Sequence, residues 1–198
     1  MTDIHQCDDT DTVEIRLKIR DISPGGFVSP LSACQFTANE PVSMNVRNAG
    51  TDTVPAGQTV TVTYSLLEGT PVSESFNLSA DLMPGQSVVH TFAGTVSLTD
   101  TADYPMMAAV NMDDDIRTSN DTARLTVYRY PKPEISFGLD DIVTVQGIEL
   151  PVEAGFAPHF AYEWQDGFDQ HLYRVTRSGN YRVKVTDTRT SCYDGDTV

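Results

Sequence analysis

A cluster of oxygen-bearing side chains lies in one short stretch of the chain. Asp113, Asp114 and Asp115 are followed closely by Asn120 and Asp121. Carboxylates crowded in one loop are typical of calcium sites, and without a cation these like charges repel one another. The pattern does not match the spaced Asp-x-Asp-x-Asp-Gly loop, so solvated turn carboxylates are the alternative. We take Asp113, Asp115, Asn120 and Asp121 as candidate calcium ligands.

The residue types that commonly act in catalysis do not occur in any recognisable catalytic motif. The four histidines are scattered and none has a metal-ligand spacing: His5, His90, His159 and His171. Serine and threonine are abundant, but there is no nucleophile elbow and no Gly-rich phosphate loop. We therefore predict that the protein is not an enzyme, and we nominate no catalytic residue.

The charge balance restricts the partners. The 198 residues include 13 Lys and Arg against 28 Asp and Glu, which gives a formal net charge of −15. Such a surface repels nucleic acid and anionic membranes. No apolar run approaches the roughly 20 residues that a membrane helix needs, and nothing resembles a secretory signal. We therefore expect neither nucleic-acid binding nor membrane insertion. We also expect the targeting information to lie outside this piece.

A short sequence occurs twice, near both ends of the chain. The residues from Cys7 to Val13 read CDDTDTV and those from Cys192 to Val198 read CYDGDTV, and both copies are preceded by Thr-Asp. The spacing indicates a repeat of about 185 residues. We therefore expect a unit of a tandem array, with the tail of a preceding copy at its front and neighbouring repeats as its partners.

The alternation of apolar and polar residues predicts β-structure throughout. Thr12 to Arg20 alternates with the period of a strand, and five later stretches do the same: Val42 to Val46, Val60 to Leu66, Met106 to Met112, Leu125 to Val127 and Tyr181 to Val185. Turn signals separate them, and no segment has a helical stripe. We predict an all-β chain of two antiparallel, Ig-like β-sandwiches in series.

The linker at Tyr130-Pro131-Lys132-Pro133 sets the expected domain boundary, because two prolines stiffen the backbone and remove ladder donors. Residues 1–20 would be the terminal strand and linker of a preceding copy, 21–130 the first domain and 131–198 the second. If Asp11 opens a final strand, its counterpart Asp196 opens one as well. The second domain is then expected to lack its last strand, which Val13 to Ile19 of a neighbouring molecule could supply.

Two parts of this sequence resemble known families. The stretch from Val42 to Gly57, with Leu82 to Ser87 and Asn120 to Thr122, resembles CARDB modules (a cell-adhesion-related domain found in bacteria). The stretch from Tyr162 to Gly167, with Ser178 to Asp187 and Cys192, is similar to the Ig-like or PKD-like repeats of giant secreted Bacteroidota surface proteins such as gliding-motility adhesins. The resemblance implies an extracellular, cell-surface location.

The cysteines are interpreted with the repeat and this resemblance together. Relatives of the second module carry a partner cysteine at the place that aligns with Val145, and it is absent here. We therefore predict a Cys7–Cys34 disulfide across the junction of two copies, with Cys192 bonded to the next repeat. Buried reduced thiols are the alternative. An oxidising compartment favours the bond.

The resemblance also implies O-glycosylation, because Asp-Thr followed by Val or Ala resembles the acceptor sequence of Bacteroidota. Five threonines have this context: Thr12, Thr53, Thr101, Thr122 and Thr197. The alternative is that Asp-Thr suits the junction between a turn and a strand.

The function that we predict is a structural spacer or stalk repeat of a large surface adhesin or filament protein, which holds a distal binding region away from the cell. A module that binds a glycan or a protein is the first alternative. Trp164, Tyr162 or Tyr173 would supply its stacking platform, although Trp164 also fits a core position and Tyr181 a corner tyrosine. An accessory region of a secreted hydrolase is the second alternative.

Overall fold

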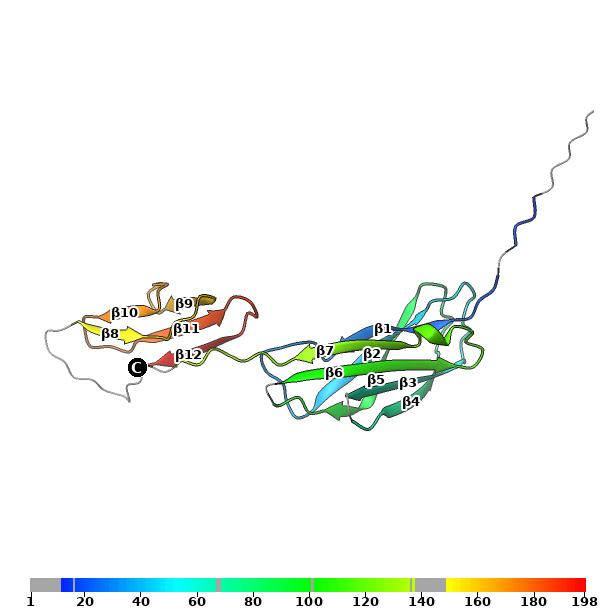
Figure 1. The fold of residues 1–198 in the computed structure, drawn as a ribbon, viewed down its shortest axis with the longest axis horizontal. Coiled ribbons are helices and arrows are strands. Elements are labelled where there is room, and N and C mark those ends of the chain that lie inside the picture. The colour runs from blue at the N-terminus through cyan, green and yellow to red at the C-terminus, as the bar shows by residue number, and fades with distance from the viewer. Residues whose placement is uncertain (1–11, 16, 67–68, 101, 136, 138–148) are drawn as a thin grey trace, which may run out of the picture.

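The computed structural model describes residues 12–15, 17–66, 69–100, 102–135, 137 and 149–198. The described chain is all-β, and its paired strands run antiparallel. Figure 1 shows two groups of strands that follow one another along the long axis. We call β1–β7 the first sandwich and β8–β12 the second sandwich.

The first sandwich has a three-stranded sheet, in the order β1-β2-β5, and a four-stranded sheet, in the order β4-β3-β6-β7. Its strands are β1 (Ile22–Ser29), β2 (Glu40–Asn48), β3 (Thr59–Leu66), β4 (Val72–Asn77), β5 (Ser87–Val96), β6 (Asp103–Met112) and β7 (Thr122–Tyr128), and a 3-10 turn, η1 (Thr118–Asn120), precedes β7. The alternating residues of β2, β3 and β6 bury one face in the core between the two sheets.

The second sandwich is smaller. It has a two-stranded sheet, β10-β8, and a three-stranded sheet, β12-β11-β9. Its strands are β8 (Leu150–Glu153), β9 (Phe160–Trp164), β10 (Leu172–Val175), β11 (Arg182–Asp187) and β12 (Tyr193–Thr197). Trp164 is buried in its core with Val152, Val183 and Val185. The core residues of the two sandwiches form two separate clusters.

Two details of the second sandwich agree with the sequence interpretation. Trp164 packs against Tyr173, with ring centroids 4.7 Å apart, and its indole N–H donates to the backbone oxygen of Gln170. The Tyr181 hydroxyl donates to the backbone oxygen of Arg177 at 2.8 Å, as a corner tyrosine does. Trp164 and Tyr181 therefore both have structural roles.

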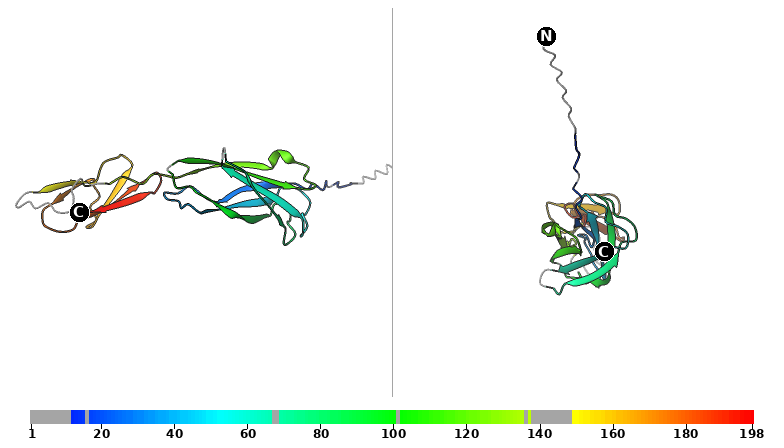
Figure 2. Two further views of the ribbon diagram at one scale, coloured as in Figure 1. Left: turned by 90° about the horizontal axis from the view of Figure 1, so that it is seen from below. Right: turned by 90° about the vertical axis from the view of Figure 1, so that its right-hand side faces the viewer.

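Two strand expectations differ from the structure. The residues described between Thr12 and Arg20 belong to no strand, and Figures 1 and 2 show this blue segment projecting away from the first sandwich. The sequence around Asp196 closes a strand rather than opening one, because β12 already pairs with β11 from Tyr193 to Thr197. A period-2 pattern fixes which residues share a face but not whether a partner strand is present.

Candidate functional site at the two ends of the first sandwich

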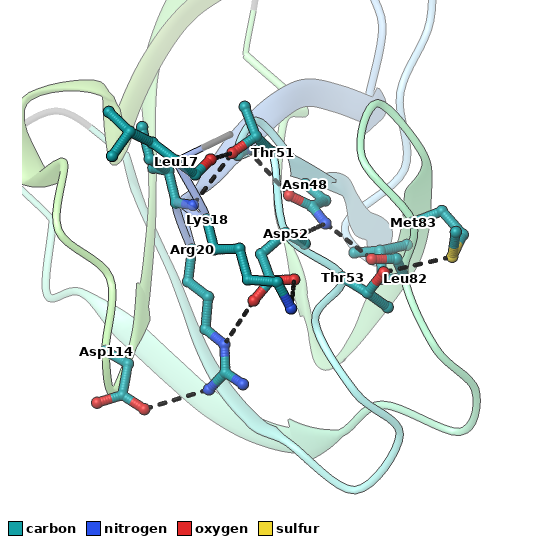
Figure 3. A network of polar contacts seen from close by, with 12 residues as sticks. Leu17, Lys18, Arg20, Asn48, Thr51, Asp52, Thr53, Leu82, Met83 and Asp114 are labelled. Atoms are coloured by element: carbon teal, nitrogen blue, oxygen red, sulfur yellow. Dashed lines mark hydrogen bonds and ion pairs between the residues drawn. The ribbon is translucent and has the colours of Figure 1, made fainter. Parts of the chain in front are cut away.

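The chain enters the first sandwich through the loop between β2 and β3. The amides of Thr51 and Asp52 both donate to the backbone oxygen of Ile19, at 2.9 and 3.0 Å. The Thr51 hydroxyl accepts from the Ile19 amide and donates to the backbone oxygen of Leu17, as Figure 3 shows for Thr51 and Leu17. We call Ile19, Arg20, Thr51 and Asp52 the N-terminal clamp.

Charged side chains surround this clamp. The Arg20 guanidinium lies 3.9 Å from the carboxylate of Asp52 and 3.3 Å from that of Asp114, and so connects two loops (Figure 3). Lys18 lies 3.6 Å from Asp52. These pairs are solvated, and each contributes little on its own. Together they hold the incoming segment against the sandwich.

Asn48 fixes the shape of the clamp loop. Its buried side-chain amide donates to the backbone oxygens of Asp52 and Leu82, at 2.9 and 2.7 Å, and its side-chain oxygen accepts from the amide of Gly50. Gly50 has no room for a side chain, since a Cβ there would overlap the backbone oxygen of Ile19. The close approach of these two backbones therefore requires glycine.

The acidic cluster lies next to the clamp, and its members have different roles. Asp113 is exposed, and Asp114 pairs with Arg20. Asp115 uses both carboxylate oxygens as acceptors, one from the amide of Ile22 at 2.7 Å and the other from that of Arg117 at 2.8 Å. Asp115 thus ties the loop between β6 and β7 to the start of β1.

Asp21 joins this cluster from the start of the first sandwich. It is fully buried, and its side chain accepts from the side-chain amide of Asn120 at 2.8 Å. Its second oxygen has no hydrogen-bond partner in the described structure and lies 3.8 Å from the guanidinium of Arg117. Sequence reasoning missed Asp21 because no local signal connects it with residues about a hundred positions away.

Asp121 is the most perturbed carboxyl of the cluster. Only 7% of the residue is exposed. Burial, together with the neighbouring charges of Asp115 and Asp21, raises the pKa of Asp121 to about 6. One oxygen each of Asp21, Asn120 and Asp121 has no hydrogen-bond partner in the described structure.

The structure does not bring the four candidate calcium ligands together as a metal site. In the described part of the chain, no group of three or more His, Cys, Asp and Glu side chains is placed to hold a metal ion. The three unpartnered oxygens are also fewer than the six or so ligands that Ca²⁺ usually takes. Of the four candidates, Asp113 is exposed and Asp115 is engaged with backbone amides.

The other end of the first sandwich is joined covalently to the second. Cys34 and Cys192 form a disulfide with a Cα–Cα distance of 5.4 Å. This corrects both expected bonds, Cys7 to Cys34 and Cys192 to the next repeat; Cys7 itself lies outside the described residues. The physical reason is the course of β1, which carries the chain from the N-terminal clamp to the opposite end of the sandwich before Cys34. Cys34 therefore meets the second sandwich and not the incoming segment.

The linker lies beside this disulfide. The amide of Tyr130 donates to the backbone oxygen of Ala33 at 2.9 Å, and the amide of Ala33 donates to that of Tyr128 at 3.1 Å, so the residues before Cys34 pair with the end of β7. Pro131 and Pro133 follow directly. A crevice of about 540 Å³ at this junction is lined by linker residues together with Cys34 and Asp194.

The remaining candidate residues are dispersed. Thr12, Thr122 and Thr197 are exposed, Thr53 is half-buried and donates to the sulfur of Met83, and Thr101 lies outside the described residues. Among the histidines, His90 and His159 have acidic neighbours, Glu74 at 3.0 Å and Asp187 at 3.5 Å. Neither pair adjoins a serine or cysteine nucleophile in the contacts that the structure describes.

A comparison with solved structures finds matches to this chain. The chain is similar to the CARDB domain of a Pyrococcus furiosus protein, solved in complex with di-metal ions, with 19% sequence identity and a TM-score of 0.40. The similarity covers 58% of this chain and 96% of that domain. No family model and no curated protein matches the sequence.

Proposed function

We propose that this chain is a structural spacer, a stiff repeat of a large surface protein that holds a distal binding region away from the cell. The observation that carries the proposal is the disulfide between Cys34 and Cys192, which joins the two sandwiches beside a linker containing Pro131 and Pro133. A covalent bond and a stiff linker at one junction both restrict hinge motion. A spacer needs a junction with restricted hinge motion, because freely hinged domains would not hold a binding region at a fixed distance.

The other end of the first sandwich supports the same role. The N-terminal clamp fixes the incoming backbone through bonds to Thr51 and Asp52, so the chain is held where it enters as well as where it leaves. The net charge of −15 would keep neighbouring molecules apart. Both features suit units arranged one after another.

The location that we propose is extracellular, at the surface of a bacterial cell, as in gliding-motility adhesins. Disulfides are typical of proteins that fold in oxidising compartments, and this chain has one. Among the residues that the structure describes, no helix has the length and apolar character that a membrane crossing needs. The repeat of CDDTDTV as CYDGDTV supports neighbouring copies as partners.

Small-angle X-ray scattering of the purified chain tests the spacer. We expect one elongated particle in the oxidised wild type, and a broader distribution of interdomain distances in the Cys34→Ser, Cys192→Ser double variant. Cys7→Ser is the matched control, because it removes a thiol without touching the bond. Identical scattering from the double variant and the wild type would contradict the proposal.

A binding role is the alternative that one observation favours. Phe156 is an exposed aromatic residue, its ring lies 5.1 Å from that of His171, and Tyr162 is close to the same histidine. Exposed aromatic rings of this kind stack on sugars. If a glycan array detects selective binding that Phe156→Ala removes and the exposed-residue control Tyr193→Ala preserves, the module binds a glycan. The remaining alternative, an accessory region of a secreted hydrolase, requires a catalytic domain on the same chain.

Calcium binding stays a proposal of its own for the acidic cluster of Asp113, Asp115, Asn120 and Asp121, to which the structure adds Asp21. The oxygens without hydrogen-bond partners on Asp21, Asn120 and Asp121 support it. Loop motion and water would have to supply the missing ligands. Isothermal titration with CaCl₂ tests it, with Asp121→Asn as the variant that removes one charge. No heat of binding in the wild type would end this part of the proposal.

A further inference from the structure

The two halves of the Cys34–Cys192 disulfide differ in their access to solvent. Cys192 is 0% exposed, whereas Cys34 is half-buried. Among the described residues that line the crevice at the junction, Cys34 is present and Cys192 is not. A thiolate that opens a disulfide must reach one of its two sulfurs, and access decides which one it attacks. A thiol from solvent can therefore reach this bond only from the side of Cys34.

The crevice has room for a small molecule and is open to solvent. Gln35, Lys132 and Glu134 in its lining are exposed. Its volume of about 540 Å³ is far larger than the roughly 10–15 Å³ that a cavity needs to hold one water molecule. A thiol of a few heavy atoms fits in this space beside Cys34.

The charges in the crevice indicate which thiols suit it. The ionisable side chains of its described lining balance formally, with Arg129 and Lys132 against Glu134 and Asp194. Because the whole chain has a net charge of −15, a thiolate is repelled less in the crevice than over the average surface. A thiol with additional carboxylates would still be repelled by the surrounding chain. The crevice therefore suits a small thiol that carries no further negative charge.

Each cysteine is also anchored in its own sandwich independently of the bond. The amide of Cys192 donates to the Thr190 hydroxyl at 3.3 Å, and its backbone oxygen accepts from the amide of Asp187 at 2.8 Å. The residue before Cys34 is paired with the end of β7. Opening the disulfide therefore removes the covalent link between the sandwiches and leaves these backbone contacts in place.

We propose that Cys34 is a site of reversible modification by a low-molecular-weight thiol. The thiolate of this molecule attacks the Sγ of Cys34, a mixed disulfide forms, the Cys34–Cys192 bond breaks, and Cys192 leaves as a thiolate that takes a proton from water. One disulfide replaces another, so no oxidant is needed. Attack by the Cys192 thiolate on the mixed disulfide reverses the step and releases the thiol. The site does not depend on the spacer role; only its consequence, a looser junction, rests on that proposal.

Thiol exchange on the full chain tests which sulfur is attacked. The chain carries Cys7→Ser, so that only the bonded pair remains, and the probe is β-mercaptoethanol. Early time points are quenched with acid, and free thiols are blocked with N-ethylmaleimide before peptide mapping. We expect the β-mercaptoethanol adduct on Cys34 and N-ethylmaleimide on Cys192, in more than about tenfold excess over the reverse pattern. The reverse pattern, equal labelling of both cysteines, or a bond that opens only at urea concentrations that unfold the chain would overturn the proposal.

Single-cysteine chains measure the access to each sulfur directly. The Cys7→Ser, Cys192→Ser variant keeps Cys34, and the Cys7→Ser, Cys34→Ser variant keeps Cys192. With dithiodipyridine, an uncharged disulfide reagent, we expect Cys34 to react more than about tenfold faster than Cys192, because only the first lines the crevice among the described residues. Similar rates for the two chains would contradict the proposal.

The charge of the lining tests the route of attack. Asp194→Asn removes a negative charge from the crevice and should speed the opening by β-mercaptoethanol about twofold or more, because the thiolate is repelled less. Asp113→Asn is the matched control, since it makes the same charge change on an exposed residue at the opposite end of the first sandwich. Equal effects of the two variants would overturn the proposed route. None of these results bears on the scattering test of the spacer, so the two proposals can fail separately.

Discussion

Cys34 and Cys192 are bonded across a sequence separation of 158 residues, and they join the segment after β1 to the residue before β12. We expect the Cys34→Ser, Cys192→Ser variant, made with Cys7→Ser, to lose about 2–5 kcal/mol of unfolding free energy, because the unfolded chain regains the freedom that so long a loop removes. Urea denaturation monitored by Trp164 fluorescence measures the loss. Equal stability of this variant and Cys7→Ser alone would mean that the bond stabilises neither sandwich.

The contact between Gly50 and Ile19 gives a second expectation. Gly50→Ala should cost about 1–3 kcal/mol, because the new methyl group overlaps the Ile19 backbone oxygen and lies 3.0 Å from the Asp21 amide. Gly94→Ala is the control, since only the Tyr64 hydroxyl lies near that position, at 3.8 Å. Faster hydrogen exchange of the Thr51 and Asp52 amides would locate the damage at the N-terminal clamp. Unchanged exchange would place the strain elsewhere.

The raised pKa of Asp121 predicts an unusual pH dependence. The folded pKa of about 6 lies above the ordinary value of 3.8, so the ionised carboxylate destabilises the fold fully above pH 6, and this cost disappears as the pH falls toward 4. Asp121→Asn should therefore raise the unfolding free energy by about 2 kcal/mol at pH 8 and by little at pH 4.5. Urea titrations at both pH values measure the difference, with exposed Asp113→Asn as the control. A gain that is equal at both pH values would rule out titration of Asp121 as its cause.

Asp187 predicts the opposite behaviour in the second sandwich. The side-chain hydrogen bonds from Arg189 hold the pKa of Asp187 at about 2, below its ordinary value of 3.8. The stability that this carboxylate contributes is therefore present above about pH 4 and is lost as the pH falls through 2. Arg189→Gln should raise the pKa of Asp187, as measured by carboxyl ¹³C NMR titration, and move acid unfolding to higher pH. Arg182→Gln, on an exposed residue of β11, is the control.

Much of this fold could be predicted from its sequence. The strands β2, β3, β6 and β11 show clear alternation and bury one face, so the pattern identified them. The strand β1 was missed because Pro24, Gly25 and Gly26 indicate a turn, yet β1 is an edge strand with register shifts, where proline and glycine are tolerated.

The cysteine pairing and the acidic cluster were harder to predict, for a common reason. Cys7 and Cys192 occupy equivalent places in a repeat, so the sequence alone could not tell which one Cys34 meets. Asp21 reaches Asn120 only because β1 begins beside the loop before β7. Contacts between distant segments depend on the direction in which each strand runs across the sheet. A local sequence pattern does not contain this information.

The disulfide also decides which part of the chain would be stretched if a unit were pulled from both ends. The shortest covalent path from Thr12 to Val198 crosses the disulfide from Cys34 to Cys192. The residues between the two cysteines therefore form a side loop off this path. Since the sequence separation is 158, this loop contains 157 residues. At about 3.5 Å per extended residue, the disulfide prevents roughly 550 Å of chain from being extended under tension. Most strands of both sandwiches, β2 to β11, would stay outside the line of tension, and only β1 and β12 would bear it.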